Sequence, residues 1–193
     1  MSRASATDDD TARAAVLKTA DEVFYERGVG AAGMADIRDL SGVSLRRLYA
    51  LYPNKRALVA AWLTARHGAW MAWFAGSIDR RRAEGEDPLL AAFDAIADWS
   101  ATPGYRGCAF LNTAAETGEI DAVHRRIIAA HKRDLITCLA GLAEAGGYRD
   151  ADELARMLAV LIDGAIVQAA VLESPYPVNA ARAAAAQLLE AHR

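Results

Sequence analysis

The sequence predicts an all-α protein of about nine helices, in which a three-helix head precedes a larger helical bundle. Apolar residues recur every three or four positions along most of the chain, which is the spacing of one face of a helix. No two segments show the alternation of paired strands, and glycine and proline divide the 193 residues into pieces of helix length. A composition of 53% hydrophobic and 24% charged residues suits a protein with a substantial core.

The first helix is predicted over residues 11–27, behind a flexible tail of residues 1–10. The tail is polar and has no apolar stretch, so it does not resemble a signal peptide. The helix carries an apolar stripe of Val16, Ala20, Val23 and Phe24. Gly28 and Gly30 are expected to end it.

Two short helices around a tight turn are predicted next, between residues 34 and 51. Gly42 supplies the turn, because glycine adopts positive φ angles at little cost. Ser44 is a good N-cap for the second of the two helices. Pro53 ends that helix, and Asn54 caps the helix that follows.

Six further helices are predicted after this pair. They cover residues 55–78, 88–99, 110–116, 121–145, 151–172 and 179–191. The first of the six begins at the head and continues into the bundle, so it couples the two mechanically. One face of it carries Leu58, Trp62, Ala69 and Trp73. The predicted domains are therefore residues 11–54 and residues 55–193.

The two short helices have the form of a helix-turn-helix, which places its second helix in the DNA major groove. Here that helix carries Arg46 and Arg47. Arginine can donate two hydrogen bonds to one guanine, worth about 1–3 kcal/mol of discrimination. Adjacent residues on a helix point about 100° apart, so one arginine is expected to contact a base and the other a phosphate.

The charge distribution agrees with this interpretation. Residues 11–66 contain nine basic and five acidic side chains, a net charge of +4, whereas the whole chain carries −3. The remainder must therefore carry −7. A basic head on an acidic body suits a DNA-binding protein with a separate second function.

An ordered set of short motifs runs through residues 11–63. They are Arg27-Gly28 at the end of the first helix, Asp36-Ile37, Ser41-Gly42-Val43-Ser44, Leu48-Tyr49, Tyr52-Pro53-Asn54-Lys55 and Ala57-Leu58. At these spacings the set resembles the TetR family of bacterial repressors. The segment from Arg106-Gly107-Cys108 to Glu116 is similar to a pattern found in a subset of that family.

The resemblance implies a homodimer with a helix-turn-helix in each subunit and a C-terminal bundle that binds a small molecule. The dimer interface would be the last two helices, residues 151–172 and 179–191, whose many alanines allow close packing. A two-fold dimer places both recognition helices on one face of a palindromic operator in double-stranded DNA, about one helical turn apart. The implied DNA-contacting residues are Ser44, Leu45, Arg46, Arg47, Tyr49 and Lys55.

The chain departs from the family pattern at a few positions. The family usually has a hydroxyl residue where this chain has Gly33, so a second-helix cap that can also contact phosphate is missing. It usually has small or short residues at Arg38, Arg46 and Arg47. These changes bear on which operator sequence is recognised rather than on DNA binding itself.

The predicted bundle is rich in aromatic side chains, which either pack the core or line a ligand cavity. The candidate ligand-binding residues are Trp62, Trp70, Trp73, Trp99, Phe110, Asn112, Glu116 and His131. Their aromatic character favours a small hydrophobic or aromatic ligand.

The remaining polar residues of the bundle allow several roles. His124 and His131 share an apolar stripe and could form a metal site with Glu116. Hydrogen-bonded core histidines or pocket donors are favoured, so no metal and no cofactor are predicted. Asp163 could cap a local turn, pair across the dimer or face the pocket. Cys108 could sense oxidants.

The leading hypothesis is a transcriptional repressor whose operator affinity falls when a small molecule binds the bundle. Activation is also compatible with the sequence. The alternative class is a helical small-molecule carrier that no longer binds DNA, and Arg46 and Arg47 argue against it. No nucleophile–base pair, phosphate-binding loop or metal signature points to an enzyme.

The sequence also bears on the compartment. The longest apolar stretches are interrupted by Asp163 and Gln168, so no segment is expected to span a bilayer. The two cysteines form no disulfide framework. We therefore expect a cytoplasmic protein.

Overall fold

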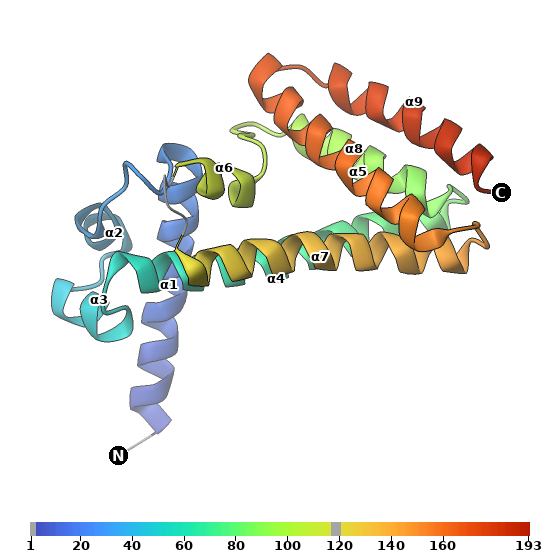
Figure 1. Ribbon diagram of the computed structural model, residues 1–193. Helices are drawn as coiled ribbons and strands as arrows, with labels where there is room; N and C mark the ends of the chain where they lie inside the picture. The colour runs from blue at the N-terminus through green and yellow to red at the C-terminus, as the bar shows by residue number, and fades with distance from the viewer. Residues whose placement is uncertain (1–2, 117–120) are drawn as a thin grey trace. The chain divides into compact units, whose positions relative to one another are not determined.

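The computed structural model describes residues 3–116 and 121–193, and these residues form nine α-helices and no strands. The all-α prediction is confirmed. The helices are α1 (Arg3–Arg27), α2 (Met34–Ser41), α3 (Leu45–Leu51), α4 (Lys55–Ala83), α5 (Pro88–Ser100), α6 (Ala109–Glu116), α7 (Ala122–Ala145), α8 (Ala151–Leu172) and α9 (Tyr176–Ala191) (Figure 1).

The helices belong to two compact units. Unit 1 comprises Met1–Gly68 and Ala109–Ile128, and unit 2 comprises Ala69–Cys108 and Ala129–Arg193. The predicted head, residues 11–54, lies entirely within unit 1. Unit 1 also holds the first half of α4, all of α6 and the start of α7, so it is larger than the helix-turn-helix alone.

The first helix begins earlier than the sequence predicts. The flexible tail predicted over residues 1–10 is wrong for residues 3–10, which are helical and continue α1. Extending an existing helix avoids the unfavourable nucleation step, which favours helix over these residues. The side chains of Asp8 and Asp9 also find an ion-pair partner in Arg47, which local sequence cannot reveal.

The turn between α2 and α3 follows the prediction closely. Gly42 adopts φ = 69° as the C-cap of α2. The Ser44 hydroxyl oxygen accepts a hydrogen bond from the Arg47 N–H at 3.4 Å, as an N-cap should. Asn54 Oδ1 accepts one from the Ala57 N–H at 2.9 Å and so caps α4.

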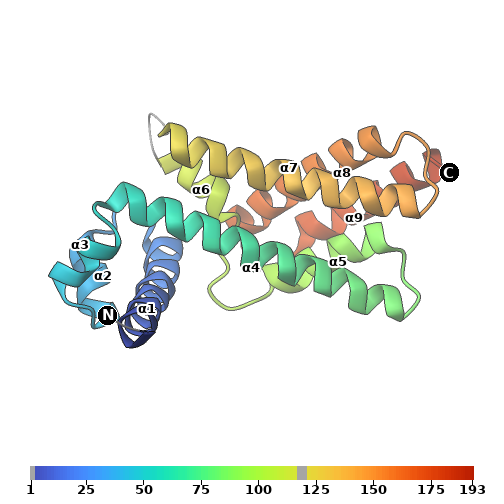
Figure 2. The same cartoon turned by 90° about the horizontal axis from the view of Figure 1, so that it is seen from below.

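In unit 1, α1 packs against both α2 and α3 (Figure 2). Ile37 of α2 and Leu48 of α3 are fully buried, and both contribute to this core. Tyr52, which follows α3, is also buried. The head is therefore a small core of its own, and it leaves the outer side of α3 exposed.

The predicted face of α4 is correct only in its first half. Leu58 and Trp62 are buried, whereas Ala69 is exposed and Trp73 is half-buried. In the second half the buried positions are Phe74, Ser77 and Ile78. The buried face turns by roughly a quarter of the circumference, because α4 leaves unit 1 after Gly68 and packs against different neighbours.

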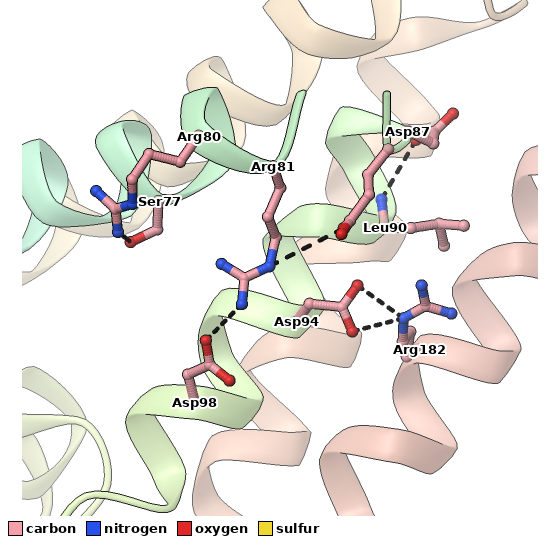
Figure 3. Close-up of polar contacts among 9 residues, drawn as sticks. Ser77, Arg80, Arg81, Asp87, Leu90, Asp94, Asp98 and Arg182 are labelled. Carbon is pink, nitrogen blue, oxygen red and sulfur yellow. Dashed lines mark hydrogen bonds and ion pairs between the residues drawn. The ribbon is translucent and has the colours of Figure 1, made fainter. Parts of the chain in front are cut away.

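In unit 2, α5 packs against both α8 and α9, and α8 packs against α9 (Figure 1). Charged side chains hold α4, α5 and α9 in place (Figure 3). Arg81 of α4 pairs with Asp98 of α5, and Asp94 of α5 accepts hydrogen bonds from Arg182 Nε through both carboxylate oxygens, at 2.8 and 2.9 Å.

Two further expectations need correction in unit 2. The last helix begins at Tyr176 rather than at residue 179, because Pro177 lies in its first turn, where its missing N–H costs nothing. By length and composition α8 is apolar enough to cross a membrane, so the expectation that no segment qualifies is wrong. Within the protein, 44% of the most apolar window of α8 is buried, and several of its valines remain exposed.

Candidate functional site

The exposed side of α3 carries the first group of predicted DNA-contacting residues. Leu48 is buried against the head, and this fixes the orientation of the short helix. As a consequence Leu45 and Tyr49 are 42% and 45% exposed, and Arg46 is exposed beside them. An exposed arginine in this position can bond base edges, the apolar Leu45 side chain can contact a thymine methyl group, and the Tyr49 hydroxyl can donate to a phosphate.

The two arginines of α3 are in different environments. Arg46 makes no ion pair with any residue that the structure describes. Arg47 Nη2 lies 2.6 Å from Asp8 Oδ2 and 3.0 Å from Asp9 Oδ1. Hydrogen bonds from Arg47 to Asp8 and then Asp9 raise the pKa of its guanidinium, which is in any case charged at neutral pH.

Ser44 and Lys55 both have intramolecular partners. The Ser44 oxygen accepts the capping hydrogen bond, which leaves its O–H free to donate to a phosphate. Lys55 Nζ donates to the Gly30 carbonyl at 3.4 Å, a weak contact that a phosphate could replace. At the start of α2, the Asp36 carboxylate accepts the Gly33 N–H at 2.7 Å, while Gly33 itself has no side chain to cap the first-turn N–H groups.

The end of α6 and the start of α7 fasten onto the head within unit 1. Glu116 Oε2 accepts a hydrogen bond from the Gly30 N–H at 2.8 Å. Asp121 pairs with Arg56 Nε at 2.7 Å, and His124 Nε2 lies 2.9 Å from the Arg56 carbonyl oxygen. Glu116 was predicted to line the ligand pocket, and it instead contacts the loop between α1 and α2.

Trp62, on α4 within unit 1, packs against α1 of the head rather than joining the aromatic side chains of unit 2. Its ring is buried edge-to-face against Phe24, with centroids 5.2 Å apart. Its indole N–H donates to Asp21 Oδ1 at 2.7 Å. Arg66 donates to the same oxygen at 2.5 Å and lies over the Tyr25 ring. No local pattern indicates this link between α1 and α4, because its members are more than 40 residues apart.

Four of the predicted ligand-binding residues do come together in unit 2. They are Trp70, Trp73, Trp99 and His131. The Trp70 ring lies at the centre, with the ring centroids of the other three 5.9, 6.1 and 5.1 Å away. Phe74 stacks on Trp70, and Tyr105 packs against Trp99 at 5.0 Å. We call these six residues the aromatic cluster.

The other predicted ligand-binding residues lie elsewhere. Phe110 is buried and Asn112 is half-buried in α6, within unit 1. Together with Trp62 and Glu116, they make up the half of the predicted set that belongs to unit 1. Aromatic composition alone does not indicate which side chains share a cavity, and the fold divides the eight residues between two units.

Among the hollows on the described part of unit 2 are two that border α8. One of about 300 Å³ is bordered by Tyr105 of the aromatic cluster, by Ser100 and Thr102, and by Glu173 and Ser174. The other, of about 590 Å³, is a shallow groove between α8 and α9. Its lining residues are Glu153, Arg156, Met157, Val160, Leu161, Ala184, Gln187 and Leu188.

The structure assigns partners to the polar residues that the sequence left open. Asp163 Oδ1 pairs with Lys132 Nζ at 2.5 Å, so it joins α8 to α7. Lys132 Nζ also lies 3.7 Å from the sulfur of Cys108, which is buried. Within the described ranges, no three His, Cys, Asp or Glu side chains are arranged to hold a metal ion. His124 and His131 are both buried.

Sequence comparisons point to one family. The model described as "Bacterial regulatory proteins, tetR family" matches residues 16–62, and the model "BetI-type transcriptional repressor, C-terminal" matches residues 107–193. The HTH-type transcriptional regulator TtgR of Pseudomonas putida is 36% identical over 67 residues, 35% of this chain and 32% of that protein. The match thus spans about a third of the length of the curated relatives.

Solved structures are similar along most of the chain. The TetR-family regulator SCO4454 from Streptomyces coelicolor is 27% identical with a TM-score of 0.81, covering 94% of this chain and 90% of its own. SAV143 from Streptomyces avermitilis, described as a putative TetR transcriptional regulator, is 27% identical with a TM-score of 0.78, covering 94% and 97%. Reduced NemR from E. coli, at 20% identity, a TM-score of 0.82 and coverage of 92% and 97%, shares the fold.

The two family models match the helix-turn-helix and the C-terminal half, and the solved regulators match the order and packing of the helices between them. Such regulators are DNA-binding transcription factors rather than enzymes, and the family binds operator DNA and small molecules and forms dimers. This chain therefore belongs to the TetR family of bacterial regulatory proteins.

Proposed function

We propose that this protein is a cytoplasmic transcriptional repressor that binds a palindromic operator as a homodimer and releases it when a small molecule binds. Residues 11–54 form the DNA-binding domain, to which Lys55 at the start of α4 adds a contact, and residues 55–193 bind the ligand and dimerise. The observation that carries the proposal is the exposed side of α3, where Arg46 stands between Leu45 and Tyr49 without an ion pair to any described residue.

The roles of the DNA-contacting residues follow from their surroundings. Arg46 donates to a base edge in the major groove, because it is exposed and has no carboxylate beside it in the described chain. Arg47, Tyr49 and Lys55 contact phosphates, which fix the position of the head on the duplex. The Ser44 hydroxyl and the N–H groups at the start of α3 add to these contacts.

The ligand is a small hydrophobic or aromatic compound that binds unit 2 at the aromatic cluster. The cluster combines apolar ring faces with polar groups such as the His131 imidazole, a combination typical of small-molecule sites. Trp70 lies on α4, the helix that begins at Lys55. A ligand that binds the DNA-free conformation more tightly than the DNA-bound one must lower operator affinity by the same factor.

The dimer forms through α8 and α9. Val160, Val167 and Val171 lie on one side of α8 and are 72%, 44% and 76% exposed. Their spacing of seven and four residues places them on one helix face. An exposed apolar stripe of this kind is unfavourable in a monomer and is covered when a second copy packs against it.

A fluorescence anisotropy titration tests the proposal. Purified protein is titrated against labelled DNA from immediately upstream of its own gene and against a scrambled duplex of the same length. We expect selective binding with two subunits, or a multiple of two, per site. The Arg46→Ala/Arg47→Ala variant should lose selectivity, since it loses a discriminating contact worth about tenfold or more in affinity.

A matched variant controls for loss of charge. Arg80→Ala/Arg82→Ala removes the same two charges from the C-terminal end of α4 in unit 2 and should leave selectivity intact. Unchanged selectivity in the Arg46→Ala/Arg47→Ala variant would rule out the assigned recognition helix. Binding that is weak, equal on both duplexes and lost in salt would favour the small-molecule carrier instead.

A further inference from the structure

The extended start of α1 brings carboxylates to the recognition helix. Asp8, Asp9 and Asp10 are consecutive and exposed, about two turns into α1. Two of them reach Arg47, a residue 38 positions further along the chain than Asp9. These carboxylates lie on the side of unit 1 that faces DNA in the proposed function, where a phosphate backbone would repel them.

Asp8 and Asp9 both form their ion pair with the same nitrogen of Arg47. A single nitrogen, Arg47 Nη2, lies 2.6 Å from Asp8 Oδ2 and 3.0 Å from Asp9 Oδ1. The carboxylates of two consecutive residues thus converge on one guanidinium nitrogen. Arg47 is less exposed than its neighbour Arg46, and its positive charge is largely compensated within the protein.

We propose that Asp8 and Asp9 compete with DNA for Arg47, so that the start of α1 acts as a built-in inhibitor of DNA binding. This inference rests on the proposed function of α3. When DNA approaches, a phosphate can take the place of the two carboxylates only by breaking both ion pairs. The carboxylates are then left unpaired near the duplex. Arg47 therefore contributes less to DNA affinity than an arginine without an ion pair would.

This competition has a specific consequence for the dependence on salt. A free arginine that contacts a phosphate displaces about one cation from DNA and adds about 0.9 to the slope of log affinity against log salt. An arginine that must first leave two carboxylates adds less to this slope, because cations from solution bind to the freed carboxylates and offset those released from DNA. Salt dependence therefore reports the inhibition separately from overall affinity.

The test compares the wild-type protein with Asp8→Asn/Asp9→Asn in full-length chains. Anisotropy titrations use the upstream duplex and the scrambled duplex over a series of salt concentrations. We expect the variant to bind both duplexes about 2- to 10-fold more tightly, in line with the strength of exposed ion pairs. Its salt slope should be steeper by up to about 0.9 per subunit.

Two controls distinguish the inhibition from a general loss of negative charge. Asp10→Asn changes the adjacent carboxylate, which has no ion pair among the described residues, and should alter the slope much less. In an Arg47→Ala background, Asp8→Asn/Asp9→Asn should no longer steepen the slope. Circular dichroism of each variant checks that the total helix content is unchanged.

Elution from heparin, a polyanion, gives a readout that does not need the operator, and Asp8→Asn/Asp9→Asn should elute at higher salt than Asp10→Asn. Weaker DNA binding by Asp8→Asn/Asp9→Asn would mean that the carboxylates position Arg47, and it would overturn the inference. Equal slopes on DNA that the wild type binds would also overturn it. Failure of every variant to bind any duplex would overturn the proposed function as well.

Discussion

At the scale of single residues, the loop between α1 and α2 depends on one exposed carboxylate and one glycine. Gly28 adopts φ = 85°, a conformation that only glycine takes without strain. A Cβ atom at this position would lie 2.7 Å from both carboxylate oxygens of Glu116. The same carboxylate accepts the Gly30 N–H, so the close approach of α6 to this loop requires glycine.

Replacing Gly28 should therefore lower the free energy of unfolding more than replacing a glycine that also has a positive φ angle but has no side chain close to it. Gly42 has φ = 69° and open space where its Cβ would lie, so Gly42→Ala isolates the cost of the backbone. That cost is about 1–2 kcal/mol. Gly28→Ala should destabilise the protein by about 1 kcal/mol more, since Glu116 must move and lose its hydrogen bond to Gly30. Urea denaturation of the full chain measures both.

The Glu116→Ala background provides the control for this difference. There the carboxylate is already absent, so Gly28→Ala and Gly42→Ala should destabilise the protein to a similar extent. A difference that persists without Glu116 would show that the extra cost lies elsewhere in the loop.

At the scale of helices, the sequence predicted boundaries where a residue forces them. Gly42, Ser44 and Asn54 each act through the backbone within three positions, so their effects are visible in the local sequence. The roles of Trp62 and Glu116 were missed, because their partners Asp21 and Gly30 lie 41 and 86 residues away. Four of the eight predicted ligand-binding residues do lie together, because helices of unit 2 pack against one another. The spacing of these residues in the sequence does not reveal that packing.

Another connection between helices depends on a side chain that the sequence did not single out. Asp87 caps α5 by accepting the N–H groups of Leu89 and Leu90 at 2.9 and 3.3 Å. The Tyr148 hydroxyl, in the turn between α7 and α8, donates to the other oxygen of Asp87 at 2.5 Å. The cap is thereby held by a contact between segments 61 residues apart.

This contact makes stability depend on pH in an alkaline range. Desolvation and the hydrogen bond to Asp87 raise the pKa of Tyr148, and these effects outweigh the opposing influence of Arg193. Because the folded-state pKa lies above the unfolded value of about 10, the contribution to stability is complete below pH 10 and is lost as pH rises through the folded pKa. Tyr148→Phe should cost about 1–2 kcal/mol at pH 8.

The measurement is the difference in unfolding free energy between the wild type and Tyr148→Phe at several pH values. This difference should be constant up to about pH 10 and shrink above it. Tyr176→Phe serves as the control, because Tyr176 is 72% exposed and its replacement should change stability little at any pH. A Tyr148→Phe difference that does not vary across this range would contradict the assigned role of the hydroxyl.

At the scale of the whole molecule, charge and apolar surface are distributed unevenly. The net charge of +4 counted over residues 11–66 overstates the field near α3, because the aspartates at positions 8–10 lie just outside that range and two of them pair with Arg47. In unit 2 the exposed apolar side chains gather on α8. They include Val160, Val167, Val171 and Leu172. A sequence count detects neither arrangement, since both arise only once the helices are packed.

The stripe on α8 yields a prediction about assembly. A glutamate within it would bury a charge among the valine side chains of the proposed interface. Val167→Glu should therefore raise the dimer dissociation constant by about 100-fold or more, since an unpaired buried charge costs several kcal/mol. Gln168→Glu adds the same charge one residue along without removing apolar area, and it should weaken the dimer much less.

Sedimentation velocity over a range of protein concentrations measures this shift, and the operator titration shows its consequence. A protein that contacts two half-sites must dimerise on the DNA if it is monomeric in solution, so Val167→Glu should bind the operator more weakly and with a steeper dependence on protein concentration. The scrambled duplex should be affected less, because single heads can bind it. A Val167→Glu protein that stays dimeric would place the interface on another surface and leave the α8 stripe without a partner.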